Sequence, residues 1–207
     1  MTLAILPLID AAIAAIRTDA EHLTALDQAI GDGDHGINMK RGFDALHDAR
    51  AELSPLAPGA ALQKAGMILV MKVGGASGPL YGSLLMGLGK ALPDAPTLDD
   101  TAIALDDGIA AVKKRGKSSA GEKTLLDVLE PTSAALHAGL AQGLAGAELA
   151  RRVAAAAAAG LATTQPMRAT KGRAAFLGER SIGHLDPGAA SSCLLIQTIC
   201  NTLEGMA

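Results

Sequence analysis

Aromatic residues and positive charge are both scarce in this sequence. Its 207 residues include one Tyr, two Phe and no Trp, although 49% of the residues are hydrophobic. The core must therefore be built from Ala, Leu, Ile, Val and Met, which favours closely packed helices. The formal net charge is −3, whereas proteins that bind nucleic acid usually carry a basic excess and stacking aromatic side chains. These two shortages argue against nucleic acid as a partner.

Long apolar runs and cysteine are scarce as well. No stretch of eighteen uncharged apolar residues occurs, so we expect no membrane span. Residues 1–16 are apolar, but they lack the basic start of a signal peptide and are interrupted by Asp10, which predicts a cytoplasmic location. Cys193 and Cys200 are seven residues apart on one predicted helix, where they share a face but are too distant for a disulfide. We expect two buried thiols.

Apolar residues recur at intervals of three, four or seven from Leu3 to Ile30, which predicts an amphipathic helix that ends at Gly31. The same periodicity, interrupted by Gly and Pro, predicts further helices over residues 35–53, 60–73, 79–90, 98–114, 124–140, 146–161 and 187–203. Neither strand-like alternation nor an internal repeat is evident. We expect an all-α bundle of about eight helices, in which residues 1–207 form a single domain.

The segment 27–38 (DQAIGDGDHGIN) is an acidic turn. Asp27, Asp32 and Asp34 occur within eight residues, among glycines that allow sharp backbone turns. Carboxylate oxygens suit hard cations such as Mg²⁺ or Ca²⁺. The pattern is not an EF-hand, because the twelfth position counted from Asp32 is Phe43 instead of an acid. We expect one or two Mg²⁺ ions that in turn bind phosphate oxygens; the alternative is that Asp34 merely caps a helix.

A glycine-rich turn, GGASGPLYG at 74–82, leads into another predicted helix. Its backbone amides and the hydroxyl of Ser77 lie at a helix start, where the helix dipole favours anions. The P-loop pattern GxxxxGK(S/T) is missing, so a nucleotide here would be held without P-loop architecture. The alternative is a purely structural turn. The basic run at 113–117 is interpreted as a solvated helix end that complements the dipole.

The connection 163–186 is long and holds few periodic apolar residues. Such segments in compact domains are usually functional lids or disordered, and the mixture of Gly, Arg and Ser here favours a lid. Arg173 or Arg180 could close over a polyphosphate, because a guanidinium group offers phosphate a fork of N–H donors; the alternative is a solvated arginine. Asp186 and Pro187 mark the next helix start as N-cap and first helical residue.

Four motifs follow one another along nearly the whole chain. They are Asp27 with GDGDHG at 31–36 and Asn38, then GGASGP at 74–79, then Asp127, and finally GERSIGH at 178–184 with DPGA at 186–189. In these motifs the chain resembles the nucleotide-binding L subunit of dihydroxyacetone kinase, a family that also occurs as the C-terminal domain of fused kinases. The resemblance implies a closed antiparallel barrel of eight helices with the nucleotide at one end.

The resemblance also implies ligands and the residues that hold them. Two Mg²⁺ ions would be bound by Asp27, Asp32 and Asp34. ADP or ATP would contact His35, Gly36, Asn38, Ala76, Ser77, Gly116, Leu125, Arg173, Asp186, Pro187 and Gly188. No residue of this chain is expected to act as a catalytic acid or base, because in the family the acceptor sugar is held on a separate K subunit.

The implied function is that of a phosphotransferase subunit of a dihydroxyacetone-type kinase, which takes part in glycerol metabolism. Phosphate would pass from Mg²⁺-bound ATP to a short-chain ketose or aldose on the K subunit, while this chain positions the nucleotide. Two uses of the nucleotide stay open: exchange of ATP for ADP, or a bound ADP recharged through a phosphotransferase-system M subunit from phosphoenolpyruvate. The alternative function is a non-catalytic sensor of the ADP or ATP state that binds a transcriptional regulator.

Overall fold

The computed structural model describes residues 5–206, and within that range the chain forms helices and no strands. The long helices are α1 (Ile5–Ile30), α2 (His35–Asp48), α4 (Pro58–Lys72), α5 (Ser77–Ala91), α6 (Leu98–Gly116), α7 (Leu126–Ala141), α8 (Gly146–Thr163) and α9 (Pro187–Met206). Two short elements complete the fold: α3 (Arg50–Leu53) and the 3-10 helix η1 (Arg173–Ser181). The predicted all-α fold is confirmed. Leu3, the first apolar position of the predicted pattern, lies outside the described residues.

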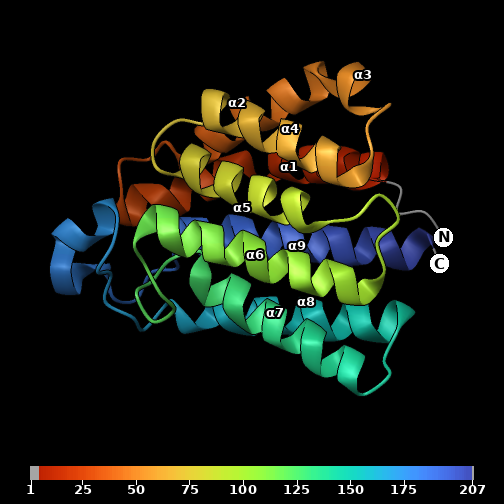
Figure 1. The fold of residues 1–207 in the computed structure, drawn as a ribbon. Coiled ribbons are helices and arrows are strands. Elements are labelled where there is room, and N and C mark those ends of the chain that lie inside the picture. Colours follow the sequence, from red (N-terminus) through yellow and green to blue (C-terminus); the bar gives the residue numbers. More distant parts are fainter. Residues whose placement is uncertain (1–4, 207) are drawn as a thin grey trace.

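The long helices form a closed ring (Figure 1). Each packs against the next long helix along the chain, and α9 packs against both α8 and α1, which closes the ring. The connections, all short except the one from α8 to α9, reverse the chain direction at each step, so neighbouring helices run antiparallel. The closed antiparallel barrel of about eight helices is therefore confirmed. One end of the barrel carries the starts of α2, α5, α7 and α9 together with η1.

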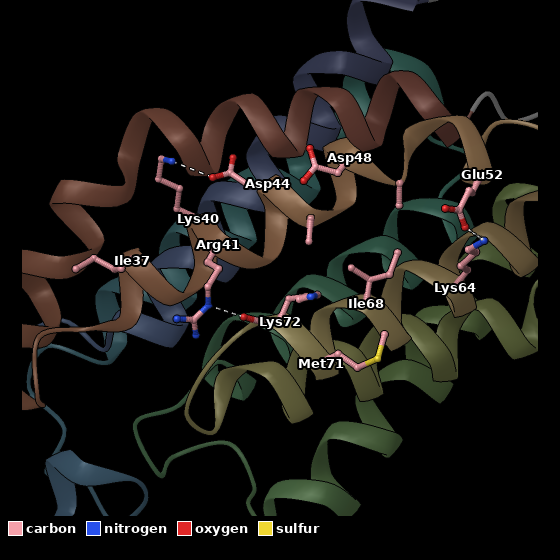
Figure 2. Close-up of a pocket in the computed structure, with 12 residues that line it drawn as sticks. Ile37, Lys40, Arg41, Asp44, Asp48, Glu52, Lys64, Ile68, Met71 and Lys72 are labelled. Atoms are coloured by element: carbon pink, nitrogen blue, oxygen red, sulfur yellow. Dashed lines mark hydrogen bonds and ion pairs between the residues drawn. The ribbon is translucent and has the colours of Figure 1, made fainter.

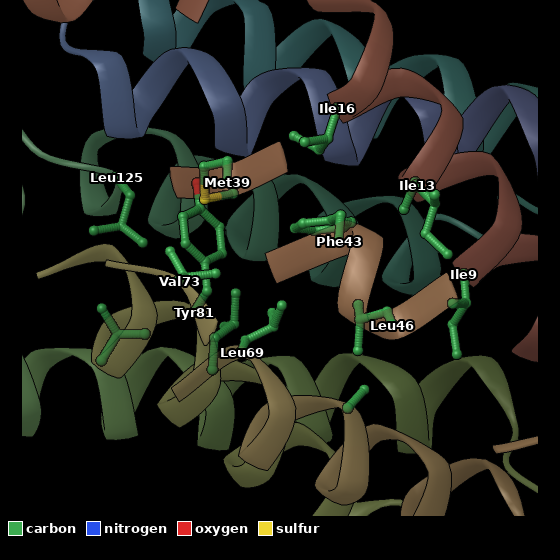
Figure 3. Packing of buried hydrophobic residues seen from close by; sticks show 14 of the residues in the cluster. Ile9, Ile13, Ile16, Met39, Phe43, Leu46, Leu69, Val73, Tyr81 and Leu125 are labelled. Carbon is green, nitrogen blue, oxygen red and sulfur yellow. The ribbon is translucent and has the colours of Figure 1, made fainter. Parts of the chain in front are cut away.

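The core inside the ring consists mainly of aliphatic side chains (Figure 3). Ile13, Ile16 and Leu69 come from α1 and α4 and pack with Met39 of α2 in the largest cluster of buried residues. The scarcity of aromatics predicted such a core, and Phe43 is one of the few rings within it. Side chains of this size leave room for the helices to approach one another closely.

Helices α4 and α5 approach most closely at two pairs of glycines. A Cβ atom on Gly66 would lie 2.8 Å from the carbonyl oxygen of Gly82, and a Cβ on Gly82 would lie 2.8 Å from that of Gly66. Gly59 and Gly89 have the same reciprocal relation at 2.6 and 2.5 Å. Backbone therefore packs on backbone along this interface, which brings the end of α4 and the start of α5 together at the end of the barrel that carries η1.

Several helix limits differ from the sequence-based ones. The second predicted helix, 35–53, is interrupted at Ala49, where α2 ends and α3 begins. Helix α4 starts at Pro58 instead of residue 60, because proline suits the first helical turn. Helix α6 continues through Gly116 and is ended by Lys117, which adopts a left-handed conformation with φ of 48°. The connection 163–186 is not wholly irregular, because it contains η1.

The two cysteines are free and buried, as predicted. Among residues 5–206, no helix combines the length and the apolar character that crossing a membrane would require.

Candidate functional site

A cavity of about 580 Å³ opens at the end of the barrel that carries η1. His35, Ser77 and Pro187, the first residues of α2, α5 and α9, line it together with Leu125, which precedes α7. Four helix N-termini thus meet at one cavity. Because each N-terminus carries a partial positive charge and unpaired N–H groups, this arrangement favours a negatively charged ligand.

The acidic turn forms one wall of the cavity and brings its three carboxylates together. One carboxylate oxygen each from Asp27, Asp32 and Asp34 can be chosen so that all lie within 4.8 Å of one another. Two glycines allow this: a Cβ on Gly31 would overlap the Asp27 carboxylate, and Gly33 adopts φ of 75°. Three converging carboxylates fit the donor set that a hard divalent cation prefers.

Asp27 also determines where α2 begins. Its Oδ2 atom accepts hydrogen bonds from the backbone N–H groups of Asp34 at 2.8 Å and His35 at 3.1 Å. Asp34 occupies the N-cap position, yet its own side chain makes no capping hydrogen bond. The interpretation of Asp34 as a simple helix cap is therefore wrong. A carboxylate from α1 satisfies the first amides of α2, which leaves the Asp34 carboxylate directed to the cavity.

The glycine-rich turn forms the opposite wall. Gly74, Gly75, Ala76 and Ser77 line the cavity immediately before or at the start of α5. Beside them, the buried Asn38 has its amide oxygen fixed by Arg41, whose Nη2 atom donates to Asn38 Oδ1 at 2.8 Å. These groups present backbone N–H, hydroxyl and amide donors, which are the groups that bind phosphate oxygens.

A buried hydrogen-bond network lies beneath the cavity and joins three helices. His35 Nδ1 lies 3.1 Å from Ser77 Oγ, and its Nε2 lies 2.8 Å from Ser191 Oγ. The Tyr81 hydroxyl lies 2.7 Å from Ser191 Oγ and 2.8 Å from Ser192 Oγ. Burial lowers the pKa of His35, although Asp27 and Asp34 oppose this effect. Burial likewise raises the pKa of Tyr81 to about 12. The network therefore holds α2, α5 and α9 in register through neutral groups.

Replacing Tyr81 by Phe tests this network. The substitution removes a hydroxyl that also donates to the carbonyl oxygen of Gly188 at 3.1 Å, and it leaves buried partners without their hydrogen bond. We expect the free energy of unfolding to fall by about 2 kcal/mol. Denaturant titration followed by far-UV circular dichroism measures this change. An unchanged midpoint would show that the network does not hold the helices together.

Residues 164–185, called the strap below, connect α8 to α9, and residues 171–174 of the strap line the cavity. The strap contains η1, whose first residue, Arg173, places its Nε atom 2.8 Å from Asp32 Oδ2. Asp186 follows the strap and caps α9, because its Oδ2 accepts from the backbone N–H of Ala189 at 2.7 Å. Burial raises the pKa of Asp186 to about 7, against the opposing effects of the Ala189 amide and Lys123. The predicted helix start at Asp186 and Pro187 is confirmed.

The structure brings nearly all the predicted site residues to this one cavity. The predicted residues that line it are Asp27, Asp32, Asp34, His35, Asn38, Ala76, Ser77, Gly116, Leu125, Arg173, Asp186, Pro187 and Gly188. Gly36 does not line it, because it packs against Ala20 and Thr24 of α1. Tyr81 and Lys123 line the cavity as well, although neither was predicted as a site residue. No local pattern distinguishes these two residues.

A larger hollow of about 860 Å³ lies on the flank of the barrel between α2 and α4 (Figure 2). Most of its charged side chains are engaged with one another or with the backbone. Lys40 pairs with Asp44 at 2.9 Å, Lys64 pairs with Glu52 at 2.5 Å, and Arg41 Nε donates to the Lys72 carbonyl at 2.8 Å. Because its groups do not converge on a common point, the smaller cavity at the end of the barrel is the candidate site.

Comparisons with known proteins identify the family of this chain. A model of the DAK2 domain family matches residues 29–201. The chain is 47% identical over 189 residues to the "PEP-dependent dihydroxyacetone kinase 1, ADP-binding subunit DhaL" of Listeria innocua, covering 90% of this chain and 89% of that protein. It is 39% identical to the "PEP-dependent dihydroxyacetone kinase, ADP-binding subunit DhaL" of Escherichia coli, covering 88% of each.

A solved structure has the same fold. The dihydroxyacetone kinase from C. freundii, crystallised in complex with AMP-PNP and Mg2+, matches with a TM-score of 0.75 and 24% sequence identity over 97% of this chain. This chain covers 34% of that larger chain, which agrees with a shared helical unit inside a longer kinase. On the family model and the two subunit relatives, the chain belongs to the DAK2 domain family, together with the ADP-binding DhaL subunits of dihydroxyacetone kinases.

Proposed function

We propose that this chain is the nucleotide-binding subunit of a dihydroxyacetone-type kinase and binds ADP or ATP together with two Mg²⁺ ions. The observation that carries the proposal is the meeting of three carboxylates with four helix N-termini at one cavity. Carboxylates bind the cations, and helix N-termini bind phosphate. The names of the two subunit relatives, both ADP-binding, support the same ligand.

The residues have distinct roles in this proposal. Asp27, Asp32 and Asp34 hold the ions, and Mg²⁺ when bound neutralises charge on the phosphoryl group that is transferred. Ser77 and the amides of 74–78 hold phosphate oxygens, while Arg173 contributes a guanidinium from the strap. The remaining predicted contacts that line the cavity are His35, Asn38, Ala76, Gly116, Leu125, Asp186, Pro187 and Gly188.

A partner must supply the acceptor. We propose that residues 1–207 act as one nucleotide-binding domain and that a K subunit presents a short-chain ketose or aldose to the mouth of the cavity. Because the relatives are named as PEP-dependent kinases, we favour a bound ADP that is recharged from phosphoenolpyruvate through an M subunit. Steady turnover with ATP and the K subunit alone, without any phosphoenolpyruvate relay, would contradict this version.

Metal removal tests the ligand. We expect ADP to bind in the presence of Mg²⁺ and chelation to weaken its binding by at least about tenfold, because the phosphates would then face three unscreened carboxylates. Isothermal titration of ADP with Mg²⁺, and again after chelation, measures this difference. Restoring Mg²⁺ should restore the affinity. An ADP affinity that is the same with and without Mg²⁺ would show that the acidic turn does not act through a cation.

A further inference from the structure

Lys123 combines two features that lysine rarely has. It is 1% exposed, and its backbone is left-handed with φ of 60°. Side chains other than glycine seldom adopt this conformation, and lysine is almost never fully buried without partners. A glycine would fit the backbone better, so the lysine side chain must offset both costs through its contacts.

The contacts are four backbone carbonyl oxygens of the strap. The ammonium group of Lys123 donates to the carbonyls of Thr164 at 2.8 Å, Met167 at 3.1 Å, Ser181 at 2.8 Å and His184 at 2.5 Å. Because an ammonium carries three N–H donors, at least one of them is shared between two of these four carbonyls. Carbonyl oxygens around the positive charge resemble the coordination of a bound cation. The Lys123 ammonium thus acts like a bound cation that is covalently attached to the chain.

These bonds hold the two ends of the strap together. Thr164 and Met167 lie at its beginning, whereas Ser181 and His184 lie at its end. Between them the strap carries Arg173 to the cavity, and it leads directly into Asp186. Without the ammonium, four partly negative oxygens would face one another around a buried space.

The loop that carries Lys123 is itself fixed to the barrel. The buried carboxylate of Asp127, in the first turn of α7, accepts from the backbone N–H groups of Gly121 at 2.5 Å and Thr124 at 2.7 Å. Hydrogen bonds from Asp127 therefore fix the backbone on both sides of Lys123, whose side chain in turn bonds to the strap. Burial lowers the pKa of Lys123, while Asp186 opposes this effect.

We propose that Lys123 is a positioning residue of the nucleotide site: its ammonium closes the strap and so holds Arg173 and the turn 186–188 at the cavity. The ligand in this inference rests on the proposed function, whereas the closure of the strap does not. The two can therefore be tested separately on the same protein.

The test compares Lys123→Gly with Lys117→Gly. Both positions are lysines with positive φ, but Lys117 has an exposed side chain and does not line the cavity. Glycine suits both backbones, so the pair separates the loss of the buried Lys123 side chain from the effect of glycine on the backbone. We expect trypsin to cleave the strap of Lys123→Gly at Lys171, Arg173 or Arg180 at least about tenfold faster than in the wild type, and ADP with Mg²⁺ to bind at least about tenfold more weakly. Lys117→Gly should match the wild type in both.

Chemical rescue distinguishes positioning from general support of the fold. Ethylammonium chloride supplies a small cation whose N–H groups can donate to the four strap carbonyls. Tetramethylammonium chloride at equal ionic strength supplies a cation without N–H donors. We expect ethylammonium to slow cleavage of the Lys123→Gly strap and to recover ADP affinity, with no recovery in tetramethylammonium. Equal effects of the two salts would overturn the inference.

A wild type that binds no ADP with Mg²⁺ would refute the proposed function, while faster cleavage of the strap in Lys123→Gly would still support the closure. A wild type that binds ADP, with a Lys123→Gly variant that binds it equally well, would overturn the positioning role. If Lys123→Gly does not fold, Lys123→Met keeps the aliphatic stem and repeats the comparison. Failure of both to fold, even with ethylammonium, would make Lys123 a core residue and overturn the inference.

Discussion

Replacing Asp32 by Asn should lower phosphoryl transfer to the K-bound acceptor by at least about a hundredfold, which is about 2.7 kcal/mol of activation free energy. The amide keeps the size of the side chain and removes one negative oxygen from the carboxylate trio. Asp32 is the best of the three acids for this test, since Asp27 also caps α2 through two backbone amides. The loss should be smaller at high Mg²⁺ concentration. Transfer rates measured across a Mg²⁺ series report both effects.

The control for this variant is Asp48→Asn. Asp48 is an exposed aspartate of the flank hollow, far from the carboxylate trio, and its replacement should leave transfer within about twofold of the wild type. The fold of Asp32→Asn should also persist, because an exposed ion pair such as Arg173 with Asp32 stabilises a protein by at most about 1 kcal/mol. Wild-type transfer in Asp32→Asn would contradict the metal role. A wild type that binds nucleotide but transfers nothing would favour the sensor function.

The helices could be predicted from the sequence because a helix with one buried face has apolar residues at intervals of three or four. Apolar spacing located the long helices to within a few residues, although α3 was not predicted as a separate element. Pro58 and Pro187 lie in the first turns of their helices, where proline is tolerated. The break at Ala49 has no comparable signal, since neither glycine nor proline occurs there. Apolar periodicity also does not predict the closure of the ring, because α9 and α1, which contact each other, lie at opposite ends of the sequence.

The site was predictable where its residues are close in sequence. The acidic turn places three carboxylates within eight positions. An ordinary surface loop is also rich in Asp and Gly, so the other motifs were needed to favour a cation site. Tyr81 meets Ser191 across 110 positions, and Lys123 meets His184 across 61. No local pattern reports such encounters, and a lysine is expected at the surface by default. The polar groups that connect the walls of the cavity therefore became visible only in the structure.

Gly36 was singled out in the sequence, but its packing role was not predicted. Its motif suggested a contact with the nucleotide, whereas the structure places it where α2 crosses α1. A Cβ atom here would overlap the carbonyl oxygen of Ala20 and would lie 2.5 Å from Oγ1 and 2.7 Å from the backbone nitrogen of Thr24. Two of these three obstacles are backbone atoms of a long helix, so no rotation of a side chain can relieve them.

Gly36→Ala should therefore lower the free energy of unfolding by about 3 kcal/mol, the upper range for overpacking at a tight contact. For a chain of this length we expect the melting temperature to fall by about 6 to 12 °C. The control is Gly205→Ala, because a Cβ there meets no atom of residues 5–206 within 4 Å and alanine favours the helix; its melting temperature should not fall. Thermal melts of the two variants without ligand measure the difference.

If Gly36→Ala melts like the wild type but loses ADP affinity, the glycine serves the nucleotide and the packing role is wrong. If it melts lower, the spacing of α1 and α2 requires glycine, and that spacing also fixes the distance from Asp27 to the first amides of α2.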